Sequence, residues 1–401
     1  MKPLVLFSDV RKFDSGYEET TYLITNTNGK DLIISAKLWN IIKYFDGKRD
    51  LVEISIILRR DEKINITISD LERIIEQLLK PNGLCLNNAT IPPPKKNKSF
   101  LFSIIIWHAR TVEIMAKPLS FLFKDPWFIL LFFISLIISS TFFLLISVRQ
   151  IWDINIQLMA PLYFYFFIFF GGFWHEIGHA SACLAAGAKP GGVGVGFYLL
   201  LPSFYIDLKD TWKLSRKDRI KVDLGGISFT LLLDLVLIII FLITSSNVIT
   251  LFLLLNKIIL IFNFLPFLKT DGYWVITDLL GVVNLHKRIK RKLLNVLSAE
   301  KKKEELRLGK LEETGFNIYL FSFLFFLIPF TWFLLGRVYF FLISYPDVVL
   351  REIKSIVSSL RPFNFSQLIS SIVLILNLFL IQFFIIFNIV RLLKLNNSKR
   401  Q

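Results

Sequence analysis

Long apolar runs separated by short polar stretches occupy most of the chain after residue 126. A run of about 20 apolar residues is long enough to cross a bilayer as a helix. The pattern therefore predicts a polytopic α-helical membrane protein with about six transmembrane helices. We place them at roughly 127–147, 157–183, 224–245, 248–268, 316–336 and 367–390.

Residues 1–88 have a different pattern, in which the apolar segments are short and alternate with charged residues. Two strand-like segments, Tyr22–Thr27 and Asp31–Ser35, flank Asn28-Gly29, a dipeptide that favours a tight hairpin turn. Three segments with helical spacing follow, and the short apolar segment Leu84–Leu86 could form a last strand. The order predicts a small α+β domain ahead of the membrane helices.

The changes in pattern divide the chain into five regions. They are a cytosolic α+β domain (1–88), a basic linker with an interfacial segment (89–125), a membrane core (126–285), a basic cytosolic segment (286–315) and a two-span membrane region (316–401). Within the second region we expect Phe100–Lys124, which mixes apolar and charged residues, to lie on the membrane surface.

Composition supports a bilayer setting, since 54% of the 401 residues are hydrophobic and the mean hydropathy is +0.58. The formal net charge of +16 comes from Lys and Arg that cluster beside apolar segments, with no nucleic-acid-binding motif among them. We therefore expect a lipid bilayer and no nucleic acid as partner. With six alternating spans these clusters fall mostly on one side, which predicts cytosolic N- and C-termini and one sizeable external loop at 337–366.

One polar motif, His175-Glu176-Ile177-Gly178-His179, interrupts the second apolar segment. Two histidines one helical turn apart lie on the same face of a helix and can hold zinc, while the glutamate beside them can act as a base. Ionisable residues at membrane depth are costly, so their presence indicates a function. The motif predicts a zinc site within the membrane.

A catalytic zinc ion needs a third protein ligand and an open position. Asp271 is the best candidate, because Pro266 ends the fourth span and Gly272 lets the backbone turn so that the carboxylate faces inward. Cys183, one turn beyond His179, is a rival ligand, although a small buried residue is the favoured interpretation.

Two opposite charges, Asp234 and Lys257, fall near the middle of the third and fourth spans. An isolated charge there is expensive, so we expect these residues to pair and to pin the two spans together.

H-E-x-x-H followed by N-x-x-P-x-x-x-x-D-G resembles the site-2 protease family of intramembrane zinc metallopeptidases. Within it, residues 202–210, 212–219 and 263–284 look like the peptide zinc metallopeptidase branch of bacterial peptide-export and maturation clusters. The resemblance covers roughly residues 120–290. It implies one Zn²⁺ per chain held by His175, His179 and Asp271, Glu176 as catalytic base, and Asn263 and Pro266 near the substrate path.

The segment Gly191–Gly196 alternates glycine with valine, a pattern that lets another backbone approach closely. A peptidase must hold its substrate extended, often as a strand added to a sheet edge. We therefore expect residues 191–201 to form a hairpin or re-entrant strand beside the site, with Gly194 and Gly196 contacting substrate. A flexible connector is the alternative.

The layout of residues 1–88 resembles the small winged-helix domains related to pyrroloquinoline quinone biosynthesis protein D. Such domains bind the leader of a precursor peptide in modified-peptide pathways, which implies the same task here. A regulatory or scaffolding winged helix without a peptide ligand is the alternative.

Together these features predict an intramembrane zinc metalloendopeptidase of a bacterial plasma (inner) membrane that acts in peptide maturation or export. Its expected partners are a peptide or single-span membrane protein substrate, the lipid bilayer and a peptide exporter. Two other functions stay open: regulated intramembrane proteolysis of a signalling protein, and a non-catalytic export or immunity partner that binds peptide without cutting it.

Overall fold

The computed structural model describes residues 2–5, 7–26, 31–84, 100–150, 160–198, 201–297 and 307–360, together with a few positions between 367 and 375. The chain divides into two compact units. The first comprises Met1–Lys98, Asp210–Ile220 and Val275–Phe321, and the second comprises Ser99–Lys209, Lys221–Trp274 and Ser322–Gln401.

The first unit contains a three-stranded antiparallel sheet of β1 (Phe7–Phe13), β2 (Thr21–Asn26) and β3 (Asp31–Ser35), in that order. The predicted hairpin is confirmed, because β2 pairs with β3 in continuous register. Its turn lies outside the described residues. Strand β1 was not predicted from the sequence, because most of its side chains are at least partly exposed and it lacks an apolar alternation.

Three helices pack on this sheet: α1 (Ala36–Ile42), α2 (Leu51–Asp61) and α3 (Ile68–Ile74), which continues through η1 (Ile75–Leu79) and η2 (Lys80–Asn82). The Ser35 hydroxyl accepts a hydrogen bond from the Leu38 N–H and caps α1. Buried apolar side chains from both layers form one core. The predicted strand at 84–86 is outside the described residues except for Leu84, which is buried in this core.

Arg219 joins three segments of the first unit. Its Nε lies 2.6 Å from Asp278 Oδ1, and its Nη2 donates to the Asp14 carbonyl oxygen at 3.0 Å. The guanidinium also stacks over the Phe13 ring, 4.7 Å from its centroid. This buried cation ties the start of α7 (Arg216–Thr244) to α9 (Asp271–Leu280) and to the loop after β1. The same unit contains the basic helix α10 (Leu285–Leu297) and the short η4 (Lys209–Lys213).

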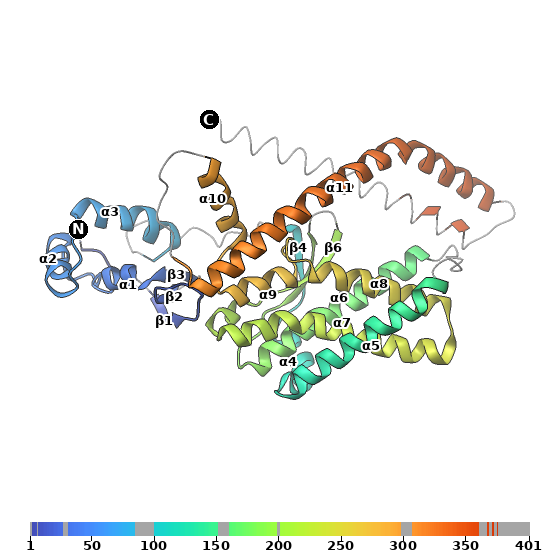
Figure 1. Cartoon of the computed structure of the whole chain (residues 1–401), viewed down its shortest axis with the longest axis horizontal. Coiled ribbons are helices and arrows are strands. Elements are labelled where there is room, and N and C mark those ends of the chain that lie inside the picture. The colour runs from blue at the N-terminus through green and yellow to red at the C-terminus, as the bar shows by residue number, and fades with distance from the viewer. Residues whose placement is uncertain are drawn as a thin grey trace. The chain divides into compact units, whose positions relative to one another are not determined.

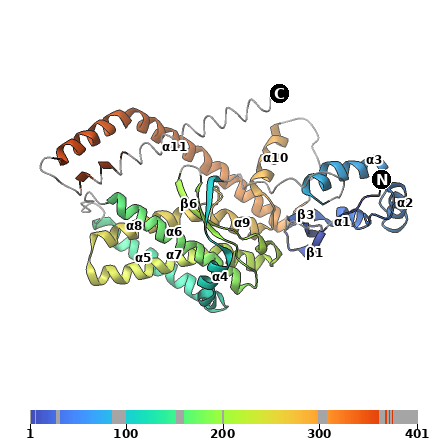
Figure 2. The ribbon, with the colours of Figure 1, turned by 180° about the vertical axis from the view of Figure 1, so that it is seen from behind.

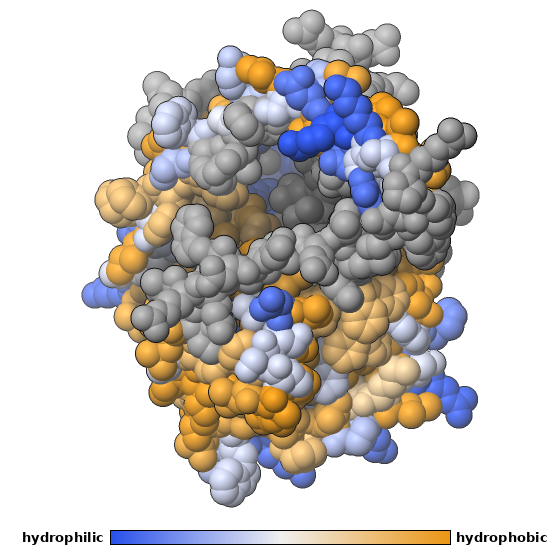
Figure 3. All heavy atoms as spheres, turned by 90° about the vertical axis from the view of Figure 1, so that its right-hand side faces the viewer, coloured by the Kyte–Doolittle hydropathy of each residue, from blue (hydrophilic) through white to orange (hydrophobic). Residues whose placement is uncertain are grey.

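The second unit is built on long helices: α5 (Trp127–Gln150), α6 (Ala160–Ala185), α7, α8 (Asn247–Phe264) and the later part of α11 (Lys310–Ser359). Helices α5 to α8 form a bundle (Figure 1), and their apolar side chains meet in two buried clusters. The outer side chains are also apolar, and orange surface covers much of the lower part of the face in Figure 3. Such a surface suits lipid rather than water.

Four helical segments in the described part of the chain are long and apolar enough to cross a membrane: Trp127–Leu145, Arg216–Thr244, Asn247–Phe264 and Lys310–Trp332. They indicate a helical membrane protein. Helix α6 is not among the four, because the polar H-E-x-x-H motif lowers its mean hydropathy. Most of the predicted last span, 367–390, lies outside the described residues, so six spans stay a prediction.

The stretch 337–366, predicted to be an external loop, is helical for most of its length, because α11 continues as one helix to Ser359, and its external position stays a prediction. Pro329 and Pro346 lie inside the helix. A proline removes one hydrogen bond, which a 50-residue helix can tolerate.

A second antiparallel sheet, β4-β5-β6, belongs to the second unit, with β4 (Phe100–Trp107), β5 (Val193–Tyr198) and β6 (Leu201–Ile206). The hairpin expected at 191–201 is present as β5 and β6. The first part of Phe100–Lys124 forms β4, which pairs with β5, and α4 (Ala109–Ala116) and η3 (Lys117–Phe123) follow. That this segment lies on the membrane surface stays a prediction. Figure 2 shows this sheet beside α6, onto which Trp107 packs.

Candidate metal centre

Three predicted ligands converge in the second unit. His175 and His179 project from one face of α6, and Asp271 is the first residue of α9. His175 Nε2 lies 2.9 Å from Asp271 Oδ2, His179 Nε2 lies 3.3 Å from Asp271 Oδ1, and the two Nε2 atoms are 3.2 Å apart. Ligands about 2.0–2.1 Å from a tetrahedral zinc ion are separated by roughly 3.3 Å. The spacing therefore fits one zinc ion.

The hydrogen bonds behind the imidazoles leave both Nε2 atoms free for a metal. His179 Nδ1 lies 2.7 Å from the Val222 carbonyl oxygen, which can only accept, so Nδ1 carries the proton. Thr230 donates its hydroxyl proton to the Gly226 carbonyl at 3.0 Å, so its oxygen accepts from His175 Nδ1 at 2.9 Å. Each Nε2 then presents a lone pair to the cluster.

Two further observations favour a cation there. A Cβ at Gly226 would overlap both Nε2 atoms, so only glycine leaves this space open. Asp271 Oδ2 is buried and finds no hydrogen-bond donor among the described residues. An anionic carboxylate between two imidazole lone pairs is the donor set of a zinc site.

Close helix crossings position these groups. Helices α6 and α7 meet at Gly178 and Gly225, where a Cβ at Gly225 would lie 2.7 Å from the Gly178 carbonyl oxygen. Small residues at a crossing let two backbones approach. Gly272 likewise lets the first turn of α9 lie against the end of α8, since a Cβ there would overlap the Phe264 carbonyl. We expected Gly272 to act through a turn. It acts through close packing instead.

The remaining predicted site residues fall around this cluster. Glu176 is buried beside His175 but does not belong to the group of converging ligand atoms, and its role as a base stays a prediction. Cys183 is fully buried and also lies outside that group, in line with the favoured interpretation. Asn263 and Pro266 are partly buried at the end of α8. Their contact with substrate stays a prediction.

Gly194 and Gly196 lie in β5, the central strand, where Gly194 pairs with Ile105 on one side and Tyr205 on the other. The backbones that approach these glycines are therefore those of β4 and β6. The sheet reaches α6 one turn before His175, since a Cβ at Gly172 would lie 2.6 Å from the Phe204 ring. A substrate strand added to this sheet would pair with β4 or β6, and substrate contact at the two glycines stays a prediction.

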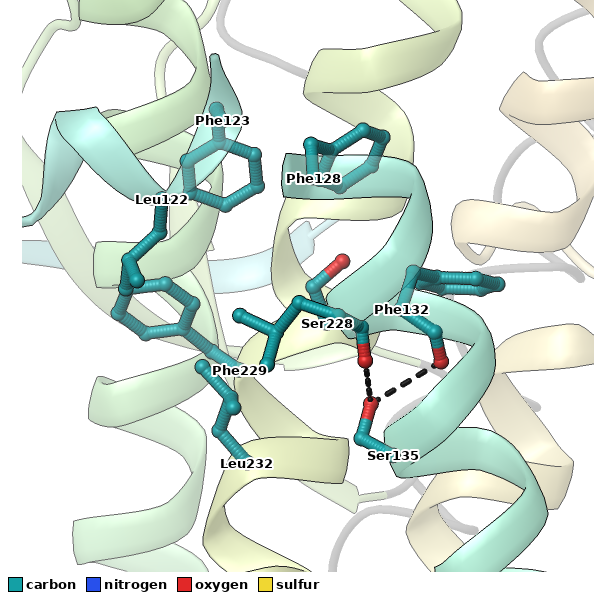
Figure 4. A pocket seen from close by; sticks show the side chains of 9 residues that line it. Leu122, Phe123, Phe128, Phe132, Ser135, Ser228, Phe229 and Leu232 are labelled. Carbon is teal, nitrogen blue, oxygen red and sulfur yellow. Dashed lines mark hydrogen bonds between the residues drawn. The ribbon is translucent and has the colours of Figure 1, made fainter. Parts of the chain in front are cut away.

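A small pocket between η3, α5 and α7 has a different character (Figure 4). Its lining is mainly apolar, and none of the converging ligands takes part in it. The Ser135 hydroxyl within it donates to carbonyl oxygens of its own helix, those of Leu131 and Phe132. The pocket therefore offers little to orient a ligand.

Sequence reasoning missed the groups behind the imidazoles, Val222 and Thr230, and the glycines that make room for them. One signal was available. Gly225-Gly226 inside an apolar span indicates a close helix crossing, and Thr230 follows four residues after Gly226 on the same helix face. A backbone carbonyl such as that of Val222 carries no sequence signal.

Comparison with known proteins gives one weak match. Over 111 residues, 27% of this chain, the sequence is 34% identical to a protein of Bacillus subtilis (strain 168) named "Putative peptide zinc metalloprotease protein YydH". The matched part spans 44% of that protein. No protein-family model and no solved structure matches the chain. The similarity supports a zinc metalloprotease and no finer assignment.

Proposed function

We propose that this protein is an intramembrane zinc metallopeptidase of the site-2 protease type, which hydrolyses a peptide bond in a small or membrane-associated peptide. One observation carries the proposal: two imidazole Nε2 atoms and a carboxylate converge at zinc-ligand spacing, with Glu176 beside them, in a bundle of apolar helices. The similarity to a protein named as a peptide zinc metalloprotease supports the same chemistry.

The residues have separate tasks in this proposal. His175, His179 and Asp271 hold zinc, which when bound supplies Lewis acidity at the scissile carbonyl. Glu176 takes a proton from the attacking water and passes it to the leaving amine. The buried position of Glu176 keeps bulk water from competing for that proton.

The substrate would lie extended beside α6, as a strand on an edge of the β4-β5-β6 sheet, with Asn263 and Pro266 along its path. The domain formed by residues 1–88 would select a precursor peptide, and a peptide exporter would act on the product. We place the protein in a bacterial plasma membrane, with its termini in the cytosol.

The test compares peptide profiles of cells that carry the wild-type protein or Glu176→Gln at equal membrane levels. The variant keeps the shape of the side chain and the zinc ligands but cannot accept a proton. We expect a shortened peptide with wild type and a loss of about 10²- to 10⁴-fold in its formation with the variant. Zinc content measured on both purified proteins is the control and should be equal.

Identical profiles, with the variant still complementing a deletion phenotype, would contradict the peptidase. They would leave a binding partner that holds peptide without cutting it.

A further inference from the structure

A second polar cluster lies inside the helical bundle, away from the converging ligands. Asp234 Oδ2 on α7 lies 2.8 Å from Lys257 Nζ on α8, which confirms the pair expected from the sequence. Ser139 on α5 hydrogen bonds to both residues. Asn256 Nδ2 donates to Asp234 Oδ1 at 2.6 Å. All four side chains are buried, so the cluster joins three helices within the bundle.

Asn256 connects this cluster to the candidate metal centre. Its amide nitrogen also donates to the Thr230 carbonyl oxygen at 2.9 Å, so its two protons bind Asp234 and Thr230. Thr230 is the residue whose hydroxyl accepts the Nδ1 proton of His175. A continuous chain of contacts thus runs from the ion pair, through Asn256 and Thr230, to one predicted zinc ligand.

Helix packing in general does not require a buried ion pair. Well-packed apolar residues of similar volume often replace a buried ion pair without loss of stability, whereas ions fix one geometry. Here the fixed geometry is the orientation of the Asn256 amide, because Asp234 Oδ1 accepts one of its protons and directs the other at Thr230. Partners behind a metal-ligating histidine set its tautomer and ring orientation.

We infer that Asn256, oriented by Asp234 and Lys257, is a positioning residue for zinc. It holds the Thr230 segment of α7 in place so that His175 keeps its Nδ1 proton and aims Nε2 at the metal. This inference rests on the proposed zinc site and adds to it a residue that does not touch the metal.

The test uses the full-length protein purified in detergent and measures the zinc Kd by competition with a chromophoric chelator. The visible absorption spectrum of the Co²⁺-substituted protein reports ligand geometry independently of activity. Asn256→Leu keeps much of the side-chain volume and removes both donated hydrogen bonds. We expect its zinc Kd to rise about 10- to 100-fold and its Co²⁺ spectrum to change.

Two comparisons sharpen the result. Thr230→Val should raise the Kd similarly, and the double variant with Asn256→Leu should add little, because both changes act through one contact chain. Thr250→Val is the matched control: it removes a buried hydroxyl from the same helix, α8, which donates only to the Ser246 carbonyl in the described contacts. Its Kd and spectrum should equal those of wild type.

An Asn256→Leu protein with the wild-type Kd and spectrum would overturn the inference and leave the cluster a structural device. Should that variant fail to accumulate, Asp234→Leu combined with Lys257→Met decides, since it removes the charges that orient the amide. A raised Kd supports the inference, and an unchanged Kd overturns it. A wild-type protein that binds no zinc would contradict the proposed function itself, a result that the variants cannot imitate.

Discussion

Two buried polar clusters in the same helical bundle differ in how their charges are compensated. In one, Asp234 has an ammonium, an amide and a hydroxyl around its two oxygens. In the other, Asp271 faces two imidazoles whose protons are committed elsewhere, and its Oδ2 has no donor in the described part of the chain. The first cluster is complete as it stands. A bound cation would complete the second.

The difference indicates function because both clusters lie among largely buried side chains. The Asp234 side chain is fully buried, and the Asp271 side chain exposes 15% of its surface beside two buried imidazoles. An uncompensated carboxylate in such surroundings is strongly destabilising, so a chain that only needed stability would supply a donor. The lack of a hydrogen-bond donor at Asp271 is explained if zinc binds there. The cluster of Asp234 and Lys257 then provides a rigid support for the zinc site.

The largest effect should come from filling the space between the imidazoles. Gly226→Ala places a methyl group against both Nε2 atoms, so we expect zinc content to fall from one ion per chain to almost none. Zinc is measured by elemental analysis of the purified protein. Gly171→Ala is the matched control in the same bundle, because its methyl group meets only ordinary contacts at 3.6 Å or more.

Full zinc occupancy in Gly226→Ala would mean that the imidazoles do not bind metal in this arrangement, and the two clusters would then not differ as we describe. Loss of zinc in both variants would point to general damage to helix packing instead.

The next effect concerns stability. Asp234→Ala leaves the Lys257 ammonium buried without its carboxylate, and loss of one partner of a buried pair costs about 3–5 kcal/mol. We expect a loss of that order in equilibrium unfolding in mixed micelles. Asp234→Leu with Lys257→Met removes both charges and should recover more than half of the loss. Equal instability of the single and double variants would show that packing, not charge compensation, governs this cluster.

The two clusters were not equally visible in the sequence. The spacing of His175, Glu176 and His179 along a helix is itself a sequence signal. Asp234 and Lys257 were recognisable as charges within apolar spans. The ligand role of Asp271 could be predicted only by inferring how two segments far apart in sequence meet. Its approach depends on Gly272 packing against the end of α8, a contact that no local pattern encodes.

The fold was predictable where pattern and length agree and not elsewhere. The β2–β3 hairpin follows a strong local turn signal, and helices α5, α7 and α8 follow apolar runs long enough to span a membrane. Strand β4 was missed because Phe100–Trp107 is a short apolar run that suits a strand or a membrane-surface segment equally, and its partner β5 lies far away in sequence. Residues 337–359 were assigned to a connecting loop because they lie between two predicted spans, but α11 continues as a helix to Ser359.

The smallest effect should appear where the same kind of ion pair meets water. Glu62 Oε1 in the first unit lies 2.6 Å from Lys43 Nζ and accepts from the Tyr44 hydroxyl at 2.9 Å. The hydrogen bond from Lys43, followed by that from Tyr44, lowers the pKa of Glu62. Because the folded pKa lies below the unfolded value, this contribution is complete above the unfolded pKa of about 4.3 and is lost as pH falls through the folded pKa.

Glu62→Gln should therefore reduce amide-exchange protection in α1 and α2 only slightly at pH 7, since exposed pairs contribute little. The difference from wild type should vanish in acid and shrink in high salt. Exchange is followed by mass spectrometry on the full-length protein, with Glu72→Gln as a control that removes the same charge from exposed α3. A loss of stability as large as that of Asp234→Ala would mean that burial does not determine how strongly these ion pairs stabilise the fold. The contrast between the two buried polar clusters would then lose its physical basis.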